Sequence, residues 1–367
     1  MKITLVISTL NPGGAERVMT TLANAWAEKQ AEVIFVTFKE PGYQSFYPLH
    51  PRVTLCNLNL LPQGQESLLS KLGNRVKRLF ALRRTIKQQK PELVISFMDT
   101  VNITTLLATI GLGIPVIISE RIDPRYFQIG FFNKLLRKIT YPFAKHIVVQ
   151  TGQILNYFPS TLHPRISIIP NPVSIPPKAT DQNRIDFEKK QIIAVGRLLK
   201  QKGFDLLLQA FSKINLKFPD WKLVIWGEGN DRSALETLSN QLKLSTQVSF
   251  PGVTDDIYSE LSQSSLFVLS SRFEGFPNAL CEAMAIGLPV IAFDCGSGPS
   301  DIVRHQIDGL LIPADNIEAL SKTMKQLMEN AALRKQFGNR ASEITDRFSV
   351  KKILGEWDKL IESCSRL

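Results

Sequence analysis

Short apolar runs alternate with amphipathic stretches along the whole chain. The runs are rich in Val and Ile, which is typical of buried strands. The predicted strands are residues 2–8, 31–38, 93–97, 115–119, 146–150, 191–196, 221–227, 247–252, 265–271 and 289–293. Residues with the spacing of an amphipathic helix include 14–29, 72–89, 203–218, 231–243 and 279–286. Because strands and helices alternate, the pattern predicts parallel sheets flanked by helices.

A proline-rich stretch separates two halves of similar design. Four prolines fall within residues 170–177, and a polar tail follows them, so this stretch is predicted to be a linker. The chain has 367 residues, a length that suits two domains. We therefore predict an α/β protein of two doubly wound, Rossmann-like domains, residues 1–172 and 173–349, facing each other across a cleft. Ligands of such sheets bind at the carboxyl ends of the strands.

Composition narrows the class of protein. No stretch of 18 apolar residues occurs, so no membrane-spanning helix is expected. The apolar start of the chain lacks a small-residue cleavage site and runs into Gly13 and Gly14, which favours a buried first strand over a secretion signal. The four cysteines are far apart and form no CxxC motif. This spacing favours a reducing cytosol and argues against a disulfide framework or a metal site.

The positive charge is concentrated in the first half. Residues 1–180 hold 21 Lys and Arg against 9 Asp and Glu, whereas residues 181–367 hold 23 against 24. Residues 71–90 contain eight cations and no acid, and residues 126–146 combine several Phe residues with cations and no acid. One interpretation is a pair of surface helices with a core face and a solvated face. In residues 71–90 the expected core face is formed by apolar residues at helical spacing, namely Leu72, Val76, Leu79, Phe80 and Ile86. The sharper interpretation is peripheral docking on an anionic membrane.

Two strand-to-helix turns could hold an anion. Gly13 and Gly14 follow the first strand, where glycines let a backbone approach a ligand and a helix N-terminus favours negative charge. Arg197 and Lys202 follow the strand at 191–196, and two cations beside a helix N-terminus suit a diphosphate. Each stretch alone is equally compatible with an ordinary turn or with solvated cations.

The stretch EGFPNALCE, residues 274–282, follows the strand at 265–271. Its turn leads to a helix predicted to start at Asn278 and Ala279, whose N–H groups could bind a phosphate. Glu282 would lie in the first turn of this helix, where it could bind a ribose diol or simply complement the helix dipole. Glu274, on the loop, could reach sugar hydroxyls.

Together, GGAER after the first strand, GR-x(4)-KG after the linker and E-x(7)-E followed by AMAIGLPVIAF resemble the retaining glycosyltransferase family four, which has the GT-B fold. The likeness covers nearly the whole chain and is strongest over residues 190–312. It is closest to bacterial enzymes that add N-acetylhexosamine or hexose to lipid-linked or polysaccharide acceptors.

The resemblance implies roles for particular residues. Arg197 and Lys202 match the pair that holds the nucleotide diphosphate, Glu282 matches the ribose ligand, and Glu274 matches the contact to the transferred sugar. The remaining matches are the phosphate and sugar loop at Phe276, Asn278 and Ala279, the first-domain glycine Gly14, and the backbone contact to the base at Val253.

The resemblance also implies the mechanism. Fixed cations and amide dipoles stabilise the leaving diphosphate, and neither a metal nor another cofactor is expected. The acceptor attacks on the face of the leaving group, and a phosphate oxygen takes its proton. One position departs from the family: where many members have a histidine, this chain has Glu120 and Arg121 after the strand at 115–119. Either residue could contact the sugar or the acceptor.

The expected partners are a nucleotide sugar, UDP-linked by preference, and a lipid-linked or glycan acceptor, with no nucleic acid. The expected location is the cytoplasm, peripheral on the inner face of the membrane through residues 71–90 and 126–146. Residues 350–367 should form a helix that packs back on the first domain. Alternatives are a non-hydrolysing sugar-nucleotide epimerase of the same fold, or a non-enzymatic protein that binds anionic surfaces.

Overall fold

The computed structural model describes residues 1–60, 68–127, 129–174 and 185–365, with the backbone alone at 68–72 and 365. Their contacts divide the chain into two compact units, Met1–Asn171 with Lys351–Leu367 and Pro172–Val350. The sequence-based division placed the boundary after residue 172 and returned the chain to the first domain at residue 350. Part of the predicted linker, residues 175–184, lies outside the described residues.

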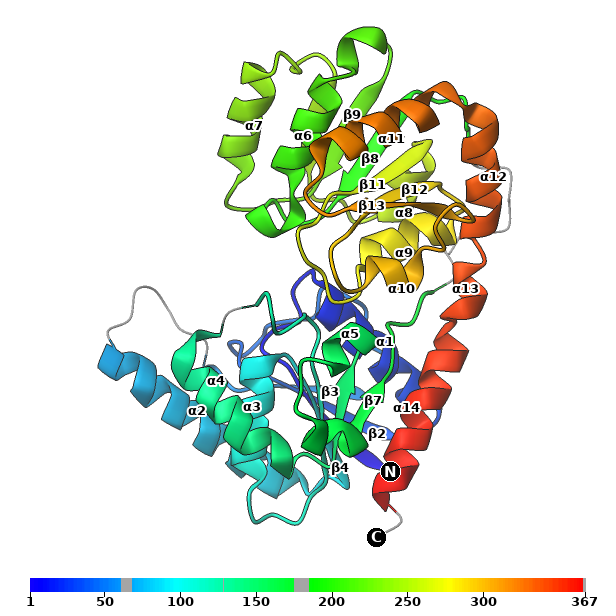
Figure 1. The fold of residues 1–367 in the computed structure, drawn as a ribbon. Helices are drawn as coiled ribbons and strands as arrows, with labels where there is room; N and C mark the ends of the chain where they lie inside the picture. Colours follow the sequence, from blue (N-terminus) through cyan, green and yellow to red (C-terminus); the bar gives the residue numbers. More distant parts are fainter. Residues whose placement is uncertain (61–67, 128, 175–184, 366–367) are drawn as a thin grey trace. The chain divides into compact units, whose positions relative to one another are not determined.

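The first unit is built on a seven-stranded sheet in the order β3-β2-β1-β4-β5-β6-β7, and all its pairs are parallel. Its strands are β1 (Lys2–Val6), β2 (Glu32–Thr37), β3 (Val53–Asn57), β4 (Leu93–Phe97), β5 (Val116–Ser119), β6 (His146–Val149) and β7 (Ile166–Ile168). Its helices are α1 (Gly14–Glu28), α2 (Leu68–Gln89), α3 (Asp99–Thr109), α4 (Gly130–Thr140), α5 (Gly152–Leu155) and the C-terminal α14 (Val350–Ser365), with 3-10 turns η1 (Tyr141–Phe143) and η2 (Ser160–Arg165) (Figure 1).

The second unit contains a six-stranded parallel sheet in the order β10-β9-β8-β11-β12-β13. Its strands are β8 (Gln191–Val195), β9 (Lys222–Trp226), β10 (Val248–Gly252), β11 (Leu266–Leu269), β12 (Val290–Asp294) and β13 (Gly309–Pro313). Its helices are α6 (Phe204–Ser212), α7 (Arg232–Gln241), α8 (Ile257–Ser262), α9 (Asn278–Ala285), α10 (Pro299–Ile302), α11 (Ile317–Glu329), α12 (Ala331–Ala341) and α13 (Ile344–Arg347), with 3-10 turns η3 (Lys200–Lys202) and η4 (Asn215–Lys217).

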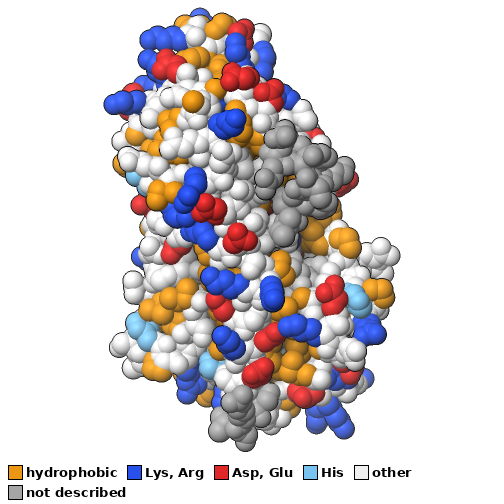
Figure 2. All heavy atoms as spheres, turned by 90° about the vertical axis from the view of Figure 1, so that its right-hand side faces the viewer, with side chains coloured by type: hydrophobic (Ala, Val, Ile, Leu, Met, Phe, Trp, Pro, Cys, Tyr) orange, Lys and Arg blue, Asp and Glu red, His pale blue; other side chains and the backbone are white. Residues whose placement is uncertain are grey.

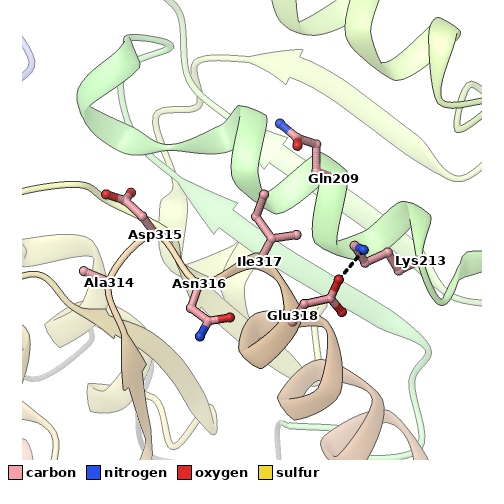
Figure 3. Close-up of a pocket in the computed structure, with 7 residues that line it drawn as sticks. All are labelled: Gln209, Lys213, Ala314, Asp315, Asn316, Ile317 and Glu318. Carbon is pink, nitrogen blue, oxygen red and sulfur yellow. Dashed lines mark hydrogen bonds and ion pairs between the residues drawn. The ribbon is translucent and has the colours of Figure 1, made fainter.

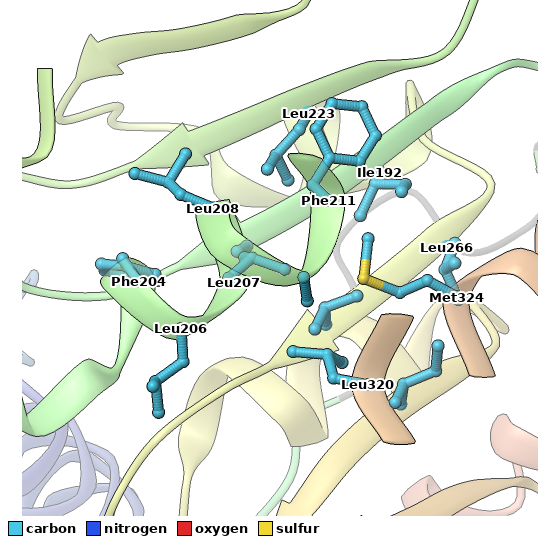
Figure 4. Close-up of a cluster of buried hydrophobic side chains, with 14 of the residues drawn as sticks. Ile192, Phe204, Leu206, Leu207, Leu208, Phe211, Leu223, Leu266, Leu320 and Met324 are labelled. Atoms are coloured by element: carbon cyan, nitrogen blue, oxygen red, sulfur yellow. The ribbon is translucent and has the colours of Figure 1, made fainter. Parts of the chain in front are cut away.

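The core of the second unit shows why its strands read as continuous apolar runs. Helix α6 buries Leu207 and Phe211 against the sheet, where they meet Ile192 of β8 (Figure 4). Helix α11 adds Leu320 and Met324 to the same cluster. Helices therefore cover the sheet, and residues on both faces of its strands are buried, which leaves no polar alternation in their sequence.

Helix α14 belongs to the first unit by its contacts. The Trp357 side chain is fully buried, with its ring centroid 6.2 Å from that of Trp26 and 6.0 Å from that of Phe97. Asp358 accepts hydrogen bonds from Trp26 Nε1 at 2.9 Å and from Lys29 Nζ at 2.6 Å. The end of the chain is thereby fastened to α1 and to the central strand β4.

The surface charge is mixed where Figure 2 shows it. On this face, Lys and Arg side chains alternate with Asp and Glu, and hydrophobic side chains gather in small groups between them. The excess of positive charge in the first half is instead concentrated in helices α2 and α4. Neither α2 nor α4 contains an acidic residue, although both contain several cations.

The contacts of Trp357 predict the stability of the first unit. Trp357→Ala would remove a large buried aromatic side chain and leave a cavity between Trp26 and Phe97, so we expect the free energy of unfolding to fall by about 3–5 kcal/mol. Urea unfolding followed by circular dichroism measures this loss. The matched control is Lys359→Ala on the exposed side of α14, which should change it by less than about 0.5 kcal/mol. Equal, small effects would contradict the docking of α14.

Candidate active site

The loop after β8 positions Lys202. Gly203 ends η3 in the left-handed region at φ 63°, and a Cβ there would lie 2.0 Å from the Ser270 carbonyl oxygen. Only glycine allows this close crossing of the two loops. Ser270 Oγ donates to the Lys202 carbonyl at 3.0 Å, and the Lys202 methylenes lie over Gly196. The lysine backbone is therefore fixed against the end of β11.

The loop after β11 holds Glu274 at the same place. Glu274 Oε1 accepts hydrogen bonds from Lys202 Nζ at 2.6 Å and from Ser271 Oγ at 2.6 Å. Ser297 Oγ donates to the Glu274 carbonyl at 2.6 Å. The Glu274 side chain is 8% exposed and the Lys202 side chain 16%. Two predicted site residues, which are 72 positions apart in the sequence, thus form a largely buried ion pair.

Helix α9 begins where expected, but Glu282 was placed in the wrong turn. The helix starts at Asn278 and contains no acidic residue in its first turn, so Glu282 lies in the second turn. Its side chain is buried, as is that of Phe276. A buried second-turn glutamate is poorly placed to complement the helix dipole, whose effect fades within the first turn. Pro277 at the N-cap supplies no side-chain cap to the helix.

Arg197 and Val253 are exposed just after β8 and β10, two strands of the same sheet that are separated by β9. Arg197 follows β8, and its guanidinium forms no ion pair with any residue that the structure describes. Val253 follows β10 and is 58% exposed, which suits a backbone or side-chain contact to a bound molecule. Ala279, in the first turn of α9, is half-buried.

In the first unit, Gly13 and Gly14 flank the start of α1. Gly13 is the N-cap with extended backbone, at φ −176°, and Gly14 is exposed. The Gly13 amide donates to the Tyr47 hydroxyl at 3.3 Å. One of the N–H groups that was expected to bind an anion, that of Gly13, is therefore already bonded to Tyr47. The sequence analysis did not identify Tyr47.

Glu120 lies in the interior of the first unit, 3% exposed. Its carboxyl accepts a hydrogen bond from the Tyr141 hydroxyl, and Arg137 Nη1 lies 3.8 Å from Glu120 Oε1. Burial and, to a lesser degree, the nearby charge of Asp99 raise the pKa of Glu120 to about 7. The group is therefore held partly neutral near physiological pH.

Arg121 is buried beside Glu120 in sequence but has different partners. Its guanidinium donates to Asn171 Oδ1 and to Ser119 Oγ, and lies 4.4 Å from the centroid of the Phe97 ring. Arg121 Nε has no hydrogen-bond partner among the described residues. Burial lowers the pKa of Arg121 to about 9.

A surface hollow of about 580 Å³ lies elsewhere in the second unit (Figure 3). It is open, and its one ion pair in the picture joins Lys213 to Glu318. Its lining is Gln209, Lys213, Ala314, Asp315, Asn316, Ile317 and Glu318. No predicted donor residue lines it. Within the described parts of the chain, no group of three His, Cys, Asp or Glu side chains is arranged to hold a metal ion.

Helix α4 exposes apolar side chains and buries polar ones. Arg137 and Thr140 point into the unit, whereas the outward face is apolar. The exposed side chains there are Phe131 at 85%, Phe132 at 53%, Leu135 at 46%, Ile139 at 54% and, just after the helix, Phe143 at 65%. We name these five residues the α4 patch. The Arg75 guanidinium of α2 lies 5.7 Å from the Phe132 ring centroid, so α2 borders this patch.

The apolar residues of helix α2 do not all face the core, although their spacing predicted that they would. Leu82 and Ile86 are buried, and Leu79 packs against the core, as a core face requires. Val76 and Phe80, which were grouped with that face, are instead exposed at 45% and 63%. The side chain of Leu72, grouped with them, lies outside the described residues. Among the described helices, none is long and apolar enough to cross a membrane.

Comparison with known proteins identifies the class. A family model described as glycosyl transferases group 1 matches residues 177–344, and one described as glycosyltransferase family 4 matches residues 12–175. A Campylobacter jejuni protein named GalNAc-alpha-(1->4)-GalNAc-alpha-(1->3)-diNAcBac-PP-undecaprenol alpha-1,4-N-acetyl-D-galactosaminyltransferase is 32% identical over 98% of each chain. An uncharacterised glycosyltransferase of Haemophilus influenzae is 30% identical over 95% of this chain and 96% of that one.

Solved structures agree on the fold. Sucrose-phosphate synthase from Thermosynechococcus elongatus superimposes with a TM-score of 0.84 at 19% identity, covering 99% of this chain and 98% of that one. Anabaena HepE in complex with UDP and glucose gives 0.78 at 18% identity over 100% of both chains. The chain therefore belongs to the group 1 and family 4 glycosyltransferases. The predicted GT-B architecture of two Rossmann-like domains and the family resemblance are confirmed.

The raised pKa of Glu120 predicts a pH-dependent stability. A free glutamate ionises near pH 4.3 in the unfolded chain, whereas folded Glu120 keeps its proton until about pH 7. The folded state thus binds more protons across this window, and its stability falls as pH rises through it. Glu120→Gln cannot ionise. We expect the loss of unfolding free energy between pH 5 and pH 8 to be smaller in this variant by about 2 kcal/mol.

Urea unfolding at both pH values measures this difference. The control is Glu92→Gln, an exposed glutamate of the same unit, which should keep the wild-type pH dependence. An unchanged pH dependence in Glu120→Gln would mean that Arg137 stabilises an ionised Glu120.

Proposed function

We propose that this glycosyltransferase is a retaining enzyme that moves a hexose or N-acetylhexosamine from a UDP-sugar to a lipid-linked or glycan acceptor. The observation that carries the proposal is the contact of Lys202 Nζ with Glu274 Oε1, at 2.6 Å, where the loops after β8 and β11 meet. The Campylobacter jejuni relative, which is named for a lipid-linked acceptor, supports the acceptor class, and the UDP complex of HepE supports the donor class.

Each part of the donor has a candidate ligand in the second unit. Exposed Arg197 and the Lys202 ammonium would bind the diphosphate, joined by the N–H groups at the start of α9. Glu274 would accept hydrogen bonds from the sugar, and Glu282 from the ribose diol. As the bond from the sugar C1 to the diphosphate breaks, charge grows on the phosphate oxygen. These fixed cations and amides would stabilise it without reorganisation, and no metal is required in this scheme.

Retention follows if the acceptor oxygen bonds to C1 on the side that the diphosphate leaves. The acceptor proton then passes to the departing phosphate oxygen, so no protein nucleophile is needed. In the first unit, Gly14 would approach the phosphates. Glu120 and Arg121 are buried among protein partners, so we assign them to shaping the acceptor side rather than to a direct bond with the sugar.

We further propose that the α4 patch contacts the inner face of an anionic membrane. Lys134 and Lys138 of α4 are exposed, and α2, whose Arg75 lies over Phe132, adds exposed Lys77 and Arg84. Aromatic and aliphatic side chains that enter the interface, with cations beside them, are the pattern of peripheral binding. A lipid-linked acceptor would then be reached at the surface that holds the enzyme.

The two alternatives are not favoured. An epimerase of this fold would not need the Arg197–Lys202 pair together with both glutamates of the E-x(7)-E motif. A nucleic-acid binder of a known class would carry a recognised binding module, and the sequence contains none.

The donor is tested by thermal shift and hydrolysis with UDP-, GDP- and ADP-sugars, with and without EDTA. We expect UDP-sugars alone to stabilise the wild type, equally with EDTA. Lys202→Ala and Glu282→Ala should weaken binding at least tenfold, because each removes a charged hydrogen-bonding partner of the donor. The matched control Lys213→Ala removes an exposed cation of the same unit and should bind normally. Absence of any shift with all three nucleotide classes would refute the donor site.

Membrane contact is tested by flotation with phosphatidylcholine vesicles, with and without phosphatidylglycerol. We expect binding only with the anionic lipid. Combining Phe131→Ser with Leu135→Ser should reduce it about tenfold or more, because two apolar side chains no longer leave water. Leu216→Ser, at a residue 91% exposed in the second unit, is the matched control and should bind like the wild type. Negligible wild-type binding to both vesicles would exclude the contact.

A further inference from the structure

Lys202 has two competing partners if the proposed function holds. In the structure its ammonium donates to Glu274 Oε1 at 2.6 Å, and both side chains are largely shielded from water. The proposed donor places a diphosphate on the same ammonium. A carboxylate and a diphosphate repel each other, and this repulsion is strong in a shielded site, where the effective dielectric constant is low. The two anions therefore compete for one cation.

Glu274 has a second support that does not involve charge. Ser271 Oγ donates to the same Glu274 oxygen at 2.6 Å, and its side chain is buried. Ser297 Oγ, also buried, holds the Glu274 carbonyl at 2.6 Å. These two hydroxyls stay in place whichever anion Lys202 binds, because neither depends on the lysine. The carboxylate would thus keep its position after losing its cation.

We propose that donor binding moves Lys202 from Glu274 to the diphosphate, and that Ser271 is the positioning residue that keeps the released Glu274 aimed at the transferred sugar. This inference rests on the proposed function. It couples the two ends of the donor site. The diphosphate must draw Lys202 away from Glu274, and the sugar hydroxyls then donate hydrogen bonds to the carboxylate that has lost its cation. UDP alone would take Lys202 from Glu274 but would supply no sugar hydroxyls to replace it.

The first test measures UDP binding to Glu274→Gln by calorimetry. An amide keeps the shape and the hydrogen bond with Ser271 but removes the charge that competes for Lys202. We expect UDP to bind about tenfold more tightly than to the wild type, a gain that loss of structure could not produce. The advantage of the UDP-sugar over UDP should disappear. The matched control is Glu318→Gln, which removes the Lys213 ion pair in the same unit and should change neither affinity.

The second test separates the role of Ser271. Ser271→Ala should bind UDP within about twofold of the wild type, but should lose about tenfold in affinity for the UDP-sugar that stabilises the wild type most. Ser271→Thr restores the hydroxyl and should recover most of that loss. The control is Ser264→Ala, a buried serine just before β11 whose hydroxyl accepts from Gln191.

The outcomes separate this inference from the proposed function. If wild-type protein binds no nucleotide, the proposed function fails, and the inference falls with it. If UDP binds the wild type but binds Glu274→Gln no more tightly, the competition for Lys202 is wrong. If Ser271→Ala keeps the full advantage of the UDP-sugar, or loses UDP binding equally, Ser271 is not a positioning residue. Thermal unfolding of each variant shows that it is folded.

Discussion

The pairing of β8 with β11 is the constraint on which the donor site depends. These strands are far apart in sequence, yet they pair directly, with Ile192 opposite Leu266 and Ile193 opposite Phe267. The strand order reverses here, since β9 and β10 extend to one side and β12 and β13 to the other. At such a switch point the following loops diverge and leave room for a ligand at the carboxyl ends. Lys202 and Glu274 come from these two loops.

Close backbone crossings make this loop site rigid. A Cβ on Gly203 would lie 2.0 Å from the Ser270 carbonyl oxygen, and one on Gly227 would lie 2.0 Å from the Gly196 carbonyl oxygen. Arg272, on the loop after β11, forms a bidentate pair with Asp205 in the first turn of α6, at 2.8 and 2.7 Å, and donates to the Lys200 carbonyl of the other loop at 2.7 Å. Loops that cross without side chains between them and are pinned by an ion pair can hold charges in fixed positions. Electrostatic stabilisation of a leaving group requires such fixed positions.

The sequence predicted the central strands and failed mainly at the sheet edges. The strands that were not predicted, β3, β7 and β13, are all edge strands. An edge strand is covered less completely, so its apolar run is short or interrupted, as in VTLCN of β3. The inner strands, such as β1 and β11, were recognised because both their faces are buried and mainly apolar.

The candidate site was predictable to the extent that its residues follow strands. Lys202 and Glu274 could be placed at strand ends from the sequence, but their ion pair could not, because it depends on which strands are neighbours. Ser271 was missed, although a serine three positions before a glutamate is a local hydrogen-bonding signal. Tyr47 left no such signal, since its contact with Gly13 joins residues 34 positions apart.

The first unit has two features that are unusual in a folded domain, a buried glutamate and an exposed apolar patch, and helix α4 contacts or carries both. Its interior buries Glu120, whereas its surface exposes the apolar α4 patch; both arrangements lower stability and are expected where function requires them. Arg137 projects from the inner side of α4, lies 3.8 Å from the Glu120 carboxylate and donates to the Tyr157 hydroxyl. Tyr141, which donates to Glu120, directly follows the same helix. A displacement of α4 would therefore change the charge and the hydrogen bonding around Glu120. The outer apolar face of α4 and the buried Glu120 carboxyl are thus structurally coupled through this helix.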